Sequence, residues 1–281
     1  MYRVSVFLLF VCCGMGCASL GTRLTHAPLP PGAPEVETVL ADLARNDEAV
    51  QSFKARGTFT LKTPELETIY LLHQSDISFK RPDYLYVVGR KYAATVLRLT
   101  CSGPEFLIEL PTERQYYYRA EGEQFAGVSF RVSPVDILRE AFLPEDWSRL
   151  SSRQVRMTTY DAGTQTADLE IYASPRAGTP RRRLTVQGAP WVVLHSQLLD
   201  EDGEVVAETA KSEYQVTPEG VRFPARVESA FPGENAFMHF DMRKFDLNAP
   251  LDALNRDIRS RAAALGREGY AKVEPRQSLK Q

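Results

Sequence analysis

The sequence predicts a mainly β protein built on a single, strongly curved antiparallel sheet. Between residues 53 and 62, Phe, Ala, Gly, Phe and Leu alternate with polar residues, which is typical of a strand with one dry and one wet face. Short turns such as Asp202-Gly203 and Glu219-Gly220 separate other apolar segments. About a dozen strands with such short connections argue for one curved sheet. The further strand segments are 67–80, 83–89, 94–101, 105–110, 115–119, 154–160, 166–173, 182–187, 191–200, 204–216, 220–230 and 235–246.

Two segments within the chain have helical periodicity instead. Residues 35–50 repeat apolar side chains at helical spacing, with charged side chains on the opposite side. Residues 134–143 follow a capping serine, carry proline at the first helical position, and stop before the next proline. The apolar face of this second segment includes Ile137, Leu138 and Phe142. Both segments are therefore predicted to be helices with one apolar face.

The N-terminal residues carry an export and lipidation signal. Arg3 is the single charge in residues 1–16, and the apolar run that follows it is far shorter than a membrane-spanning helix. Gly14-Met15-Gly16-Cys17 resembles the lipobox of bacterial lipoproteins, in which a small residue precedes a cysteine that receives diacylglycerol. This resemblance implies cleavage before Cys17 and lipid attachment to its thiol. The alternative is an ordinary secretory signal that happens to contain cysteines.

The chain is expected to divide into four parts. Residues 1–16 are the signal peptide, and residues 17–34 are the lipidated cysteine and a proline-rich tether that suits a spacer above a bilayer. Residues 35–247 form the β domain. Residues 248–281 hold a third helix, which begins at Asn248-Ala-Pro250 and closes at Gly266, and a polar tail that is expected to fray.

Charge and cysteine content agree with an exported, non-nucleic-acid-binding protein. The whole chain has 34 basic and 36 acidic residues, and this balance gives no electrostatic footprint for nucleic acid. Cleavage would leave Cys17 and Cys101, so an acylated Cys17 leaves no partner for a disulfide. For Cys101 a buried, small apolar role is favoured over a reactive thiol.

No pattern in the sequence supports an enzyme. The four histidines lie in separate segments without further metal ligands at suitable spacing. Nucleophile-elbow, zinc-protease, phosphate-loop and dinucleotide motifs are absent from the sequence. The basic run over 181–183 opens a strand and is interpreted as a solvated edge that discourages pairing between sheets. We therefore expect no catalytic residue, no metal and no cofactor.

Several short motifs, taken in order, resemble the LolA/LolB family of outer-membrane lipoprotein carriers. The motifs are Phe53-x-x-x-Gly57-x-Phe59, Phe79-Lys-Arg-Pro-Asp83, the helical segment 133–144 and Gly220-Val-Arg-Phe-Pro224. The resemblance spans residues 35–247. It implies an incomplete β-barrel whose open side is covered by lid helices and whose apolar interior accepts acyl chains.

Eleven apolar side chains are expected to face this interior. An apolar void in a large barrel can hold a ligand, and each buried methylene contributes about 0.8 kcal/mol. The alternative is that the same side chains simply fill a core, and the segments 35–50 and 134–143 would then be packing elements rather than lids. The expected cavity-lining residues are Phe53, Phe59, Ile77, Phe79, Leu97, Leu99, Phe106, Ile108, Met238, Phe240 and Met242.

One loop departs from the family pattern. LolB-like proteins place an exposed leucine after the third strand, whereas the matching loop here offers Arg90, Lys91 and Tyr92. An aromatic ring and cations could contact lipid headgroups. A solvated hairpin is the alternative. The loop lacks the exposed leucine that helps LolB-like proteins insert cargo into the membrane.

These features lead to two functional hypotheses. The first is a lipid-anchored lipoprotein on the periplasmic face of the outer membrane that binds acyl chains of lipoproteins or lipids in transport. Ala18 and Ser19 follow the lipidated cysteine without an aspartate, which the lipoprotein resemblance associates with the outer membrane. The second is a non-enzymatic scaffold or accessory subunit of an envelope complex, with a filled barrel and a protein partner.

Overall fold

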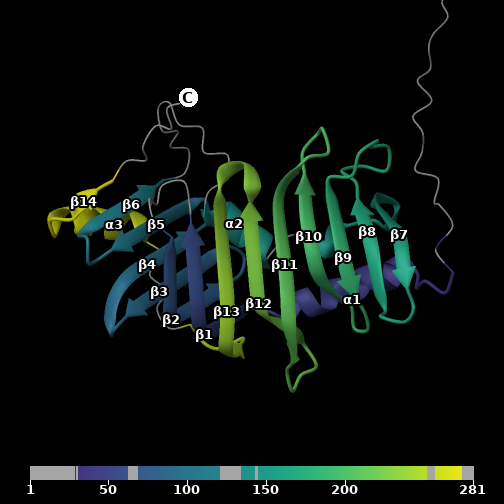
Figure 1. Ribbon diagram of the computed structural model, residues 1–281, viewed down its shortest axis with the longest axis horizontal. Helices are drawn as coiled ribbons and strands as arrows, with labels where there is room; N and C mark the ends of the chain where they lie inside the picture. The colour runs from purple at the N-terminus through teal and green to yellow at the C-terminus, as the bar shows by residue number, and fades with distance from the viewer. Residues whose placement is uncertain are drawn as a thin grey trace, which may run out of the picture.

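The computed structural model describes residues 29, 31–62, 69–120, 134–142, 145–251 and 257–273, with side chains in the second helix from Leu138 onward. These residues form one sheet of 14 strands with three α-helices (Figure 1). The helices are α1 (Val36–Glu48), α2 (Pro134–Phe142) and α3 (Ile258–Arg267), with short 3₁₀ turns at Trp147–Arg149, Ser152–Gln154 and Pro232–Glu234. The strands are β1 (Ser52–Lys62), β2 (Tyr70–Lys80), β3 (Tyr84–Lys91), β4 (Ala94–Ser102), β5 (Glu105–Leu110), β6 (Gln115–Arg119), β7 (Val155–Asp161), β8 (Thr166–Ile171), β9 (Arg182–Gln187), β10 (Val192–Leu199), β11 (Val205–Val216), β12 (Arg222–Phe231), β13 (Ala236–Leu247) and β14 (Ala271–Lys272).

The sheet is one continuous, unclosed surface. Its strand order is β14-β6-β5-β4-β3-β2-β1-β13-β12-β11-β10-β9-β8-β7, so β14 and β7 form the two edges. Neighbouring strands are antiparallel except β14, which is parallel to β6. The β1–β13 pair joins the first strand of the domain to the last long one. The predicted mainly β fold, a single antiparallel sheet forming an incomplete barrel with few helices, is therefore confirmed.

Each predicted strand segment contains a strand, but the C-terminal region differs from the prediction. The tail does not fray directly after the third helix, because β14 pairs its Ala271 and Lys272 with β6. The third helix also does not begin near Asn248. The side chain of Asn248 instead accepts from the backbone N–H of Gln51 at 2.8 Å and donates to the Ala49 carbonyl at 2.8 Å. The helix begins after Asp257, whose carboxylate accepts from the Ser260 N–H.

The Phe-x-x-x-Gly-x-Phe motif has a steric basis in β1. A Cβ atom at Gly57 would lie 1.8 Å from the backbone oxygen of Asp241 on β13. The register of the β1–β13 pair shifts between Arg56 and Gly57, so the two backbones approach closely at this bulge. Phe53 and Phe59, on either side of the glycine, are both fully buried. Glycine is therefore required where β1 bends between two core phenylalanines.

The sheet covers two separate apolar cores. The first core gathers side chains of β1–β6 and β11–β13 with Leu138, Ala141 and Phe142 of α2. The second gathers side chains of β7–β10 with Trp147 and the apolar stripe of α1. Figure 1 shows α1 and α2 behind the strands in that view. A smaller cluster holds α3 against Leu107 and Tyr116, which come from β5 and β6. The concave face is thus divided between two helices.

Candidate functional site

The concave face of the first core is the candidate binding surface. All eleven side chains that the sequence places toward an interior are buried there. They also belong to one contiguous cluster. Because side chains alternate between the two faces of a strand, one face of five strands (β1, β2, β4, β5 and β13) supplies these eleven side chains. Whether it receives a ligand depends on what covers it.

Helix α2 covers this surface with an aromatic side chain. The ring of Phe142 lies among three of the expected cavity-lining phenylalanines, with centroid distances of 5.2 Å to Phe53, 5.5 Å to Phe79 and 5.0 Å to Phe240. Leu138 is fully buried in the same cluster. Rings at these distances are in contact, so the described core is packed here and space for an acyl chain requires α2 to move.

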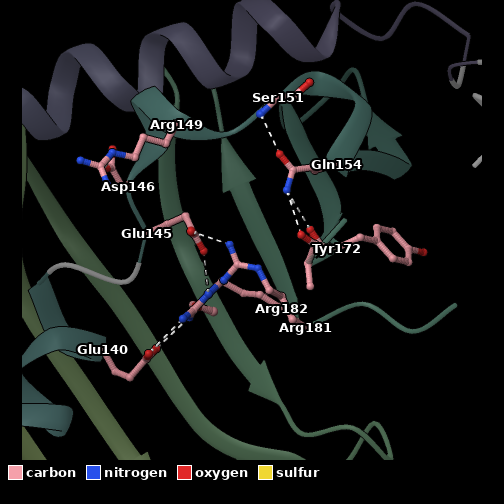
Figure 2. Close-up of polar contacts among 11 residues, drawn as sticks. Glu140, Glu145, Asp146, Arg149, Ser151, Gln154, Tyr172, Arg181 and Arg182 are labelled. Carbon is pink, nitrogen blue, oxygen red and sulfur yellow. Dashed lines mark hydrogen bonds and ion pairs between the residues drawn. The ribbon is translucent and has the colours of Figure 1, made fainter. Parts of the chain in front are cut away.

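A buried ion pair also holds α2 to the sheet. Arg182 of β9 is 2% exposed and donates to both carboxylate oxygens of Glu140 on α2, at 2.7 and 2.9 Å. It also donates to the hydroxyl of Ser196 at 2.7 Å. Arg181 donates to Glu145, just after α2, at 2.6 Å, and Figure 2 shows these side chains converging below α1. Arg182 at the start of β9 and Arg181, which precedes it, thus fix α2 and the residue Glu145 that follows it.

This arrangement corrects the interpretation of the basic run over 181–183. The sheet places β9 between β8 and β10, so the run does not lie at an edge. Arg182 is in phase with the buried Leu184 and Val186, and Arg183 is exposed. The signal in the sequence was the alternation of apolar and polar residues along β9. This alternation places one of the three consecutive arginines on the buried face.

A small cavity lies where the two cores meet. Its volume is about 70 Å³, well below the roughly 300–1,000 Å³ of ligand pockets. Its polar lining includes Asp47 of α1, Arg81 and Lys211 of β11. Asp47 and Arg81 form an ion pair at 2.7 Å, and burial raises the pKa of the Asp47 carboxyl. Burial lowers the pKa of Lys211 to about 8. Lys211 was not among the residues predicted from the sequence, although it follows the buried Ala207 and Thr209 at alternate positions of β11.

The predicted membrane-contact loop is a tight hairpin between β3 and β4. Tyr92 is 92% exposed and, with Ala93, has positive φ, as expected of a two-residue hairpin turn. Lys91 lies 6.0 Å from the centre of the Tyr92 ring. Arg90 pairs with Asp76 of β2. The tip therefore presents one aromatic ring and one cation, and the second predicted cation is held by a carboxylate.

Several other predicted residues have plain outcomes. Cys17 lies outside the described residues, as does the side chain of Ile137. Cys101 is fully buried, and burial raises the pKa of its thiol, which agrees with a small apolar role. No group of three or more His, Cys, Asp or Glu within the described ranges could hold a metal ion.

No helix in the described part of the chain is both long enough and apolar enough to cross a membrane.

The fold matches known structures although the sequence does not. No family model and no curated protein matches the sequence. A DUF1329 family protein from Desulfovibrio piger matches with a TM-score of 0.53 and 12% identity, over 81% of this chain and 99% of that chain. A putative outer membrane lipoprotein-sorting protein domain from Vibrio parahaemolyticus matches with a TM-score of 0.46 and 11% identity, over 83% and 99% of the two chains. A LolA superfamily protein from Nitrosomonas europaea matches with a TM-score of 0.44 and 11% identity, over 78% of this chain and 96% of that chain. The match to the DUF1329 family protein is a likeness of fold.

Proposed function

We propose that this chain is a membrane-anchored, non-enzymatic carrier of the cell envelope that receives acyl chains of lipoproteins or lipids on the concave face of its sheet. The observation that carries the proposal is the way this face is covered. A helix of 9 residues closes it. Among its described side chains, that helix is held by Leu138, Ala141 and Phe142 in the first core and by one buried ion pair. A ligand can replace these contacts without breaking the sheet.

Binding would proceed by movement of α2. Withdrawal of Phe142 would leave a slot between Phe53, Phe79 and Phe240, which an acyl chain would fill. Each methylene buried there contributes about 0.8 kcal/mol, so a chain of ordinary length offsets the loss of one buried ring and one ion pair. Release would follow the same path in reverse, toward an acceptor with more apolar surface. No bond in the cargo is made or broken.

The N-terminal signal supplies the location in this proposal. Cleavage before Cys17 and acylation of its thiol would hold the protein on a membrane, and the residues that follow favour the periplasmic face of the outer membrane. The exposed ring of Tyr92 would then contact lipid headgroups beside Lys91.

Native mass spectrometry of the mature chain, after incubation with a synthetic triacylated peptide, tests the carrier function. We expect a one-to-one complex. Phe142→Ala removes the ring from the slot and should increase the fraction of protein that binds the peptide. Val39→Ala in α1 removes buried apolar atoms from the second core and should leave the bound fraction unchanged. A mature chain that takes up neither acylated peptide nor phospholipid would rule out the carrier function.

A scaffold function is the second candidate, and two observations favour it. The described part of the first core is packed, and Ile69 and Leu71 expose more than half of their surface beside the start of β2. Exposed large apolar side chains close together are a feature of protein contact sites. Ile69→Ser together with Leu71→Ser should abolish capture of an envelope protein and leave acyl binding intact if the scaffold function holds.

A further inference from the structure

Lys211 is a cation on the buried side of the sheet. It pairs with the fully buried Val227 of β12, and cross-strand partners face the same side. Ala207 and Thr209, which precede it at alternate positions of β11, are also buried. The alternation of the strand therefore directs the Lys211 side chain toward the cavity between the two cores, which it lines.

The other charges at this cavity are already engaged. Arg81 donates to the Val50 carbonyl at 2.8 Å and pairs with Asp47 at 2.7 Å. Arg222 donates to the Pro190 carbonyl at 2.8 Å. In contrast, Lys211 forms no hydrogen bond and no ion-pair contact with any of the residues that the structure describes. The lining thus holds three cations and one carboxylate. Of the three cations, Lys211 is the one that makes no hydrogen bond or ion pair with the described residues.

The rest of the lining is aromatic and continues into the first core. Phe53 and Phe79 line both the cavity and the slot, and Phe142, which fills the slot, also lines the cavity. Trp147 and Trp191 of the second core complete the aromatic lining. A volume of about 70 Å³ accepts a compact group and no more. A ligand whose charged end lies at Lys211 would therefore place an attached apolar chain in the slot beneath α2.

We propose that the Lys211 cavity binds the oxyanion headgroup, carboxylate or phosphate, of an amphiphile whose apolar chain occupies the slot vacated by Phe142. This rests on the proposed function, because the chain needs the same slot. An oxyanion would accept hydrogen bonds from the Lys211 ammonium, which forms none with the described residues, and charge-assisted bonds of this kind are the stronger ones. Acidic amphiphiles would bind in preference to neutral ones with the same chain.

Charged groups of four elements act on Lys211 from around the cavity. Asp47 of α1 and Glu140 of α2 favour its charged form, while Arg81 and Arg182 of β9 disfavour it. Because desolvation is the largest cause of its lowered pKa, the ammonium gains more from a bound anion than an exposed lysine would. The preference for an acid is expected to decline as the pH rises above about 8, where the free site loses its charge.

Photo-crosslinking of the mature chain in phosphatidylcholine vesicles tests the proposal. The probes are a palmitic acid analogue with a diazirine in its chain and the matching fatty alcohol, and crosslinked peptides are identified by mass spectrometry. We expect crosslinks at the residues around Phe142, with about tenfold higher yield for the acid, the gain expected from one charge-assisted hydrogen bond. Lys211→Met should lower the crosslinking yield of the acid to that of the alcohol. Lys211→Arg should retain most of the preference for the acid. Lys244→Met, at an exposed lysine of β13, is the matched control and should change nothing.

The outcomes separate this proposal from the carrier function. Equal yields of acid and alcohol in the unaltered chain, or an undiminished preference in Lys211→Met, would overturn the anion site and leave the carrier function standing. Failure of both probes to react would overturn both. Loss of the acid crosslink on addition of millimolar inorganic phosphate would show that the site takes a soluble anion, and the amphiphile assignment would then be wrong. Thermal unfolding of Lys211→Met establishes that the variant is folded.

Discussion

The two halves of the sheet are covered by helices that are attached in different ways. Helix α1 covers the second core with a stripe of four aliphatic side chains. Its Asn46 also exchanges two hydrogen bonds with the backbone of Arg222, at 2.9 and 2.8 Å. Among its described side chains, helix α2 contributes Leu138, Ala141 and Phe142 to the first core, and Glu140 forms a buried ion pair with Arg182. An apolar stripe has no alternative partner near the sheet, whereas a ring and an ion pair can be replaced by a ligand. The contrast indicates that α1 is a fixed cover and α2 the movable one.

The largest effect is expected from Arg182→Met. Removing one partner of a buried ion pair costs about 3–5 kcal/mol of stability, because it leaves the carboxylate of Glu140 buried and unpaired. Chemical unfolding of the variant measures this loss, and Arg183→Met, at the exposed neighbour, is the control. Adding Glu140→Leu to Arg182→Met should recover most of the loss. If Arg182→Met costs no more than Arg183→Met, the ion pair does not hold α2 and the contrast between the helices fails.

Two matched leucines compare the covers directly. Leu138→Ala in α2 and Leu40→Ala in α1 each remove a buried leucine, so each should cost about 2–5 kcal/mol in the free energy of unfolding. Their effects on ligand should differ. Loosening α2 is expected to speed uptake of an acylated peptide in stopped-flow fluorescence, and loosening α1 is not. Equal acceleration by both variants would mean that α1 opens as well.

At the junction of the two cores, Lys211→Met should stabilise the protein in a pH-dependent manner. In the unfolded chain a lysine titrates near 10.4, whereas burial lowers the pKa of Lys211 to about 8 in the folded protein. Between these values the unfolded chain binds the extra proton, so the stability of the unaltered protein rises with pH. The advantage of Lys211→Met should therefore be greatest below pH 8 and shrink toward pH 10.5. Unfolding curves of both proteins at pH 7 and pH 10 measure it, and a constant difference would show that the ammonium is well solvated.

The smallest effect on stability is expected at the hairpin tip, away from both cores. Tyr92→Ser changes an exposed side chain and should alter stability by less than about 0.5 kcal/mol. Its effect should appear in transfer, as slower delivery of acylated peptide to anionic vesicles. If Tyr92→Ser delivers the peptide at the unaltered rate, the tip is a solvated hairpin that does not contact the membrane.

Local patterns were sufficient to predict the strands and two of the helices. Alternating and helical spacing give each segment its preferred conformation without information from distant residues. For the same reason the eleven apolar side chains expected to face inward could be named, and they are buried together. The third helix was misplaced because Asn248 bonds to a segment almost two hundred residues away in the sequence, at Gln51.

The sequence by itself determined the alternation that builds one antiparallel sheet and the apolar face of that sheet. Only the tertiary structure decided that this sheet covers two cores, that Phe142 fills the slot, and that Arg182 and Lys211 lie on the buried side. The physical reason is that periodicity assigns a side chain to a face of a strand but not to a partner. Glu140 and Arg182 are brought into contact by the packing of α2 on the sheet, and Lys211 has no such contact with any residue in the described ranges.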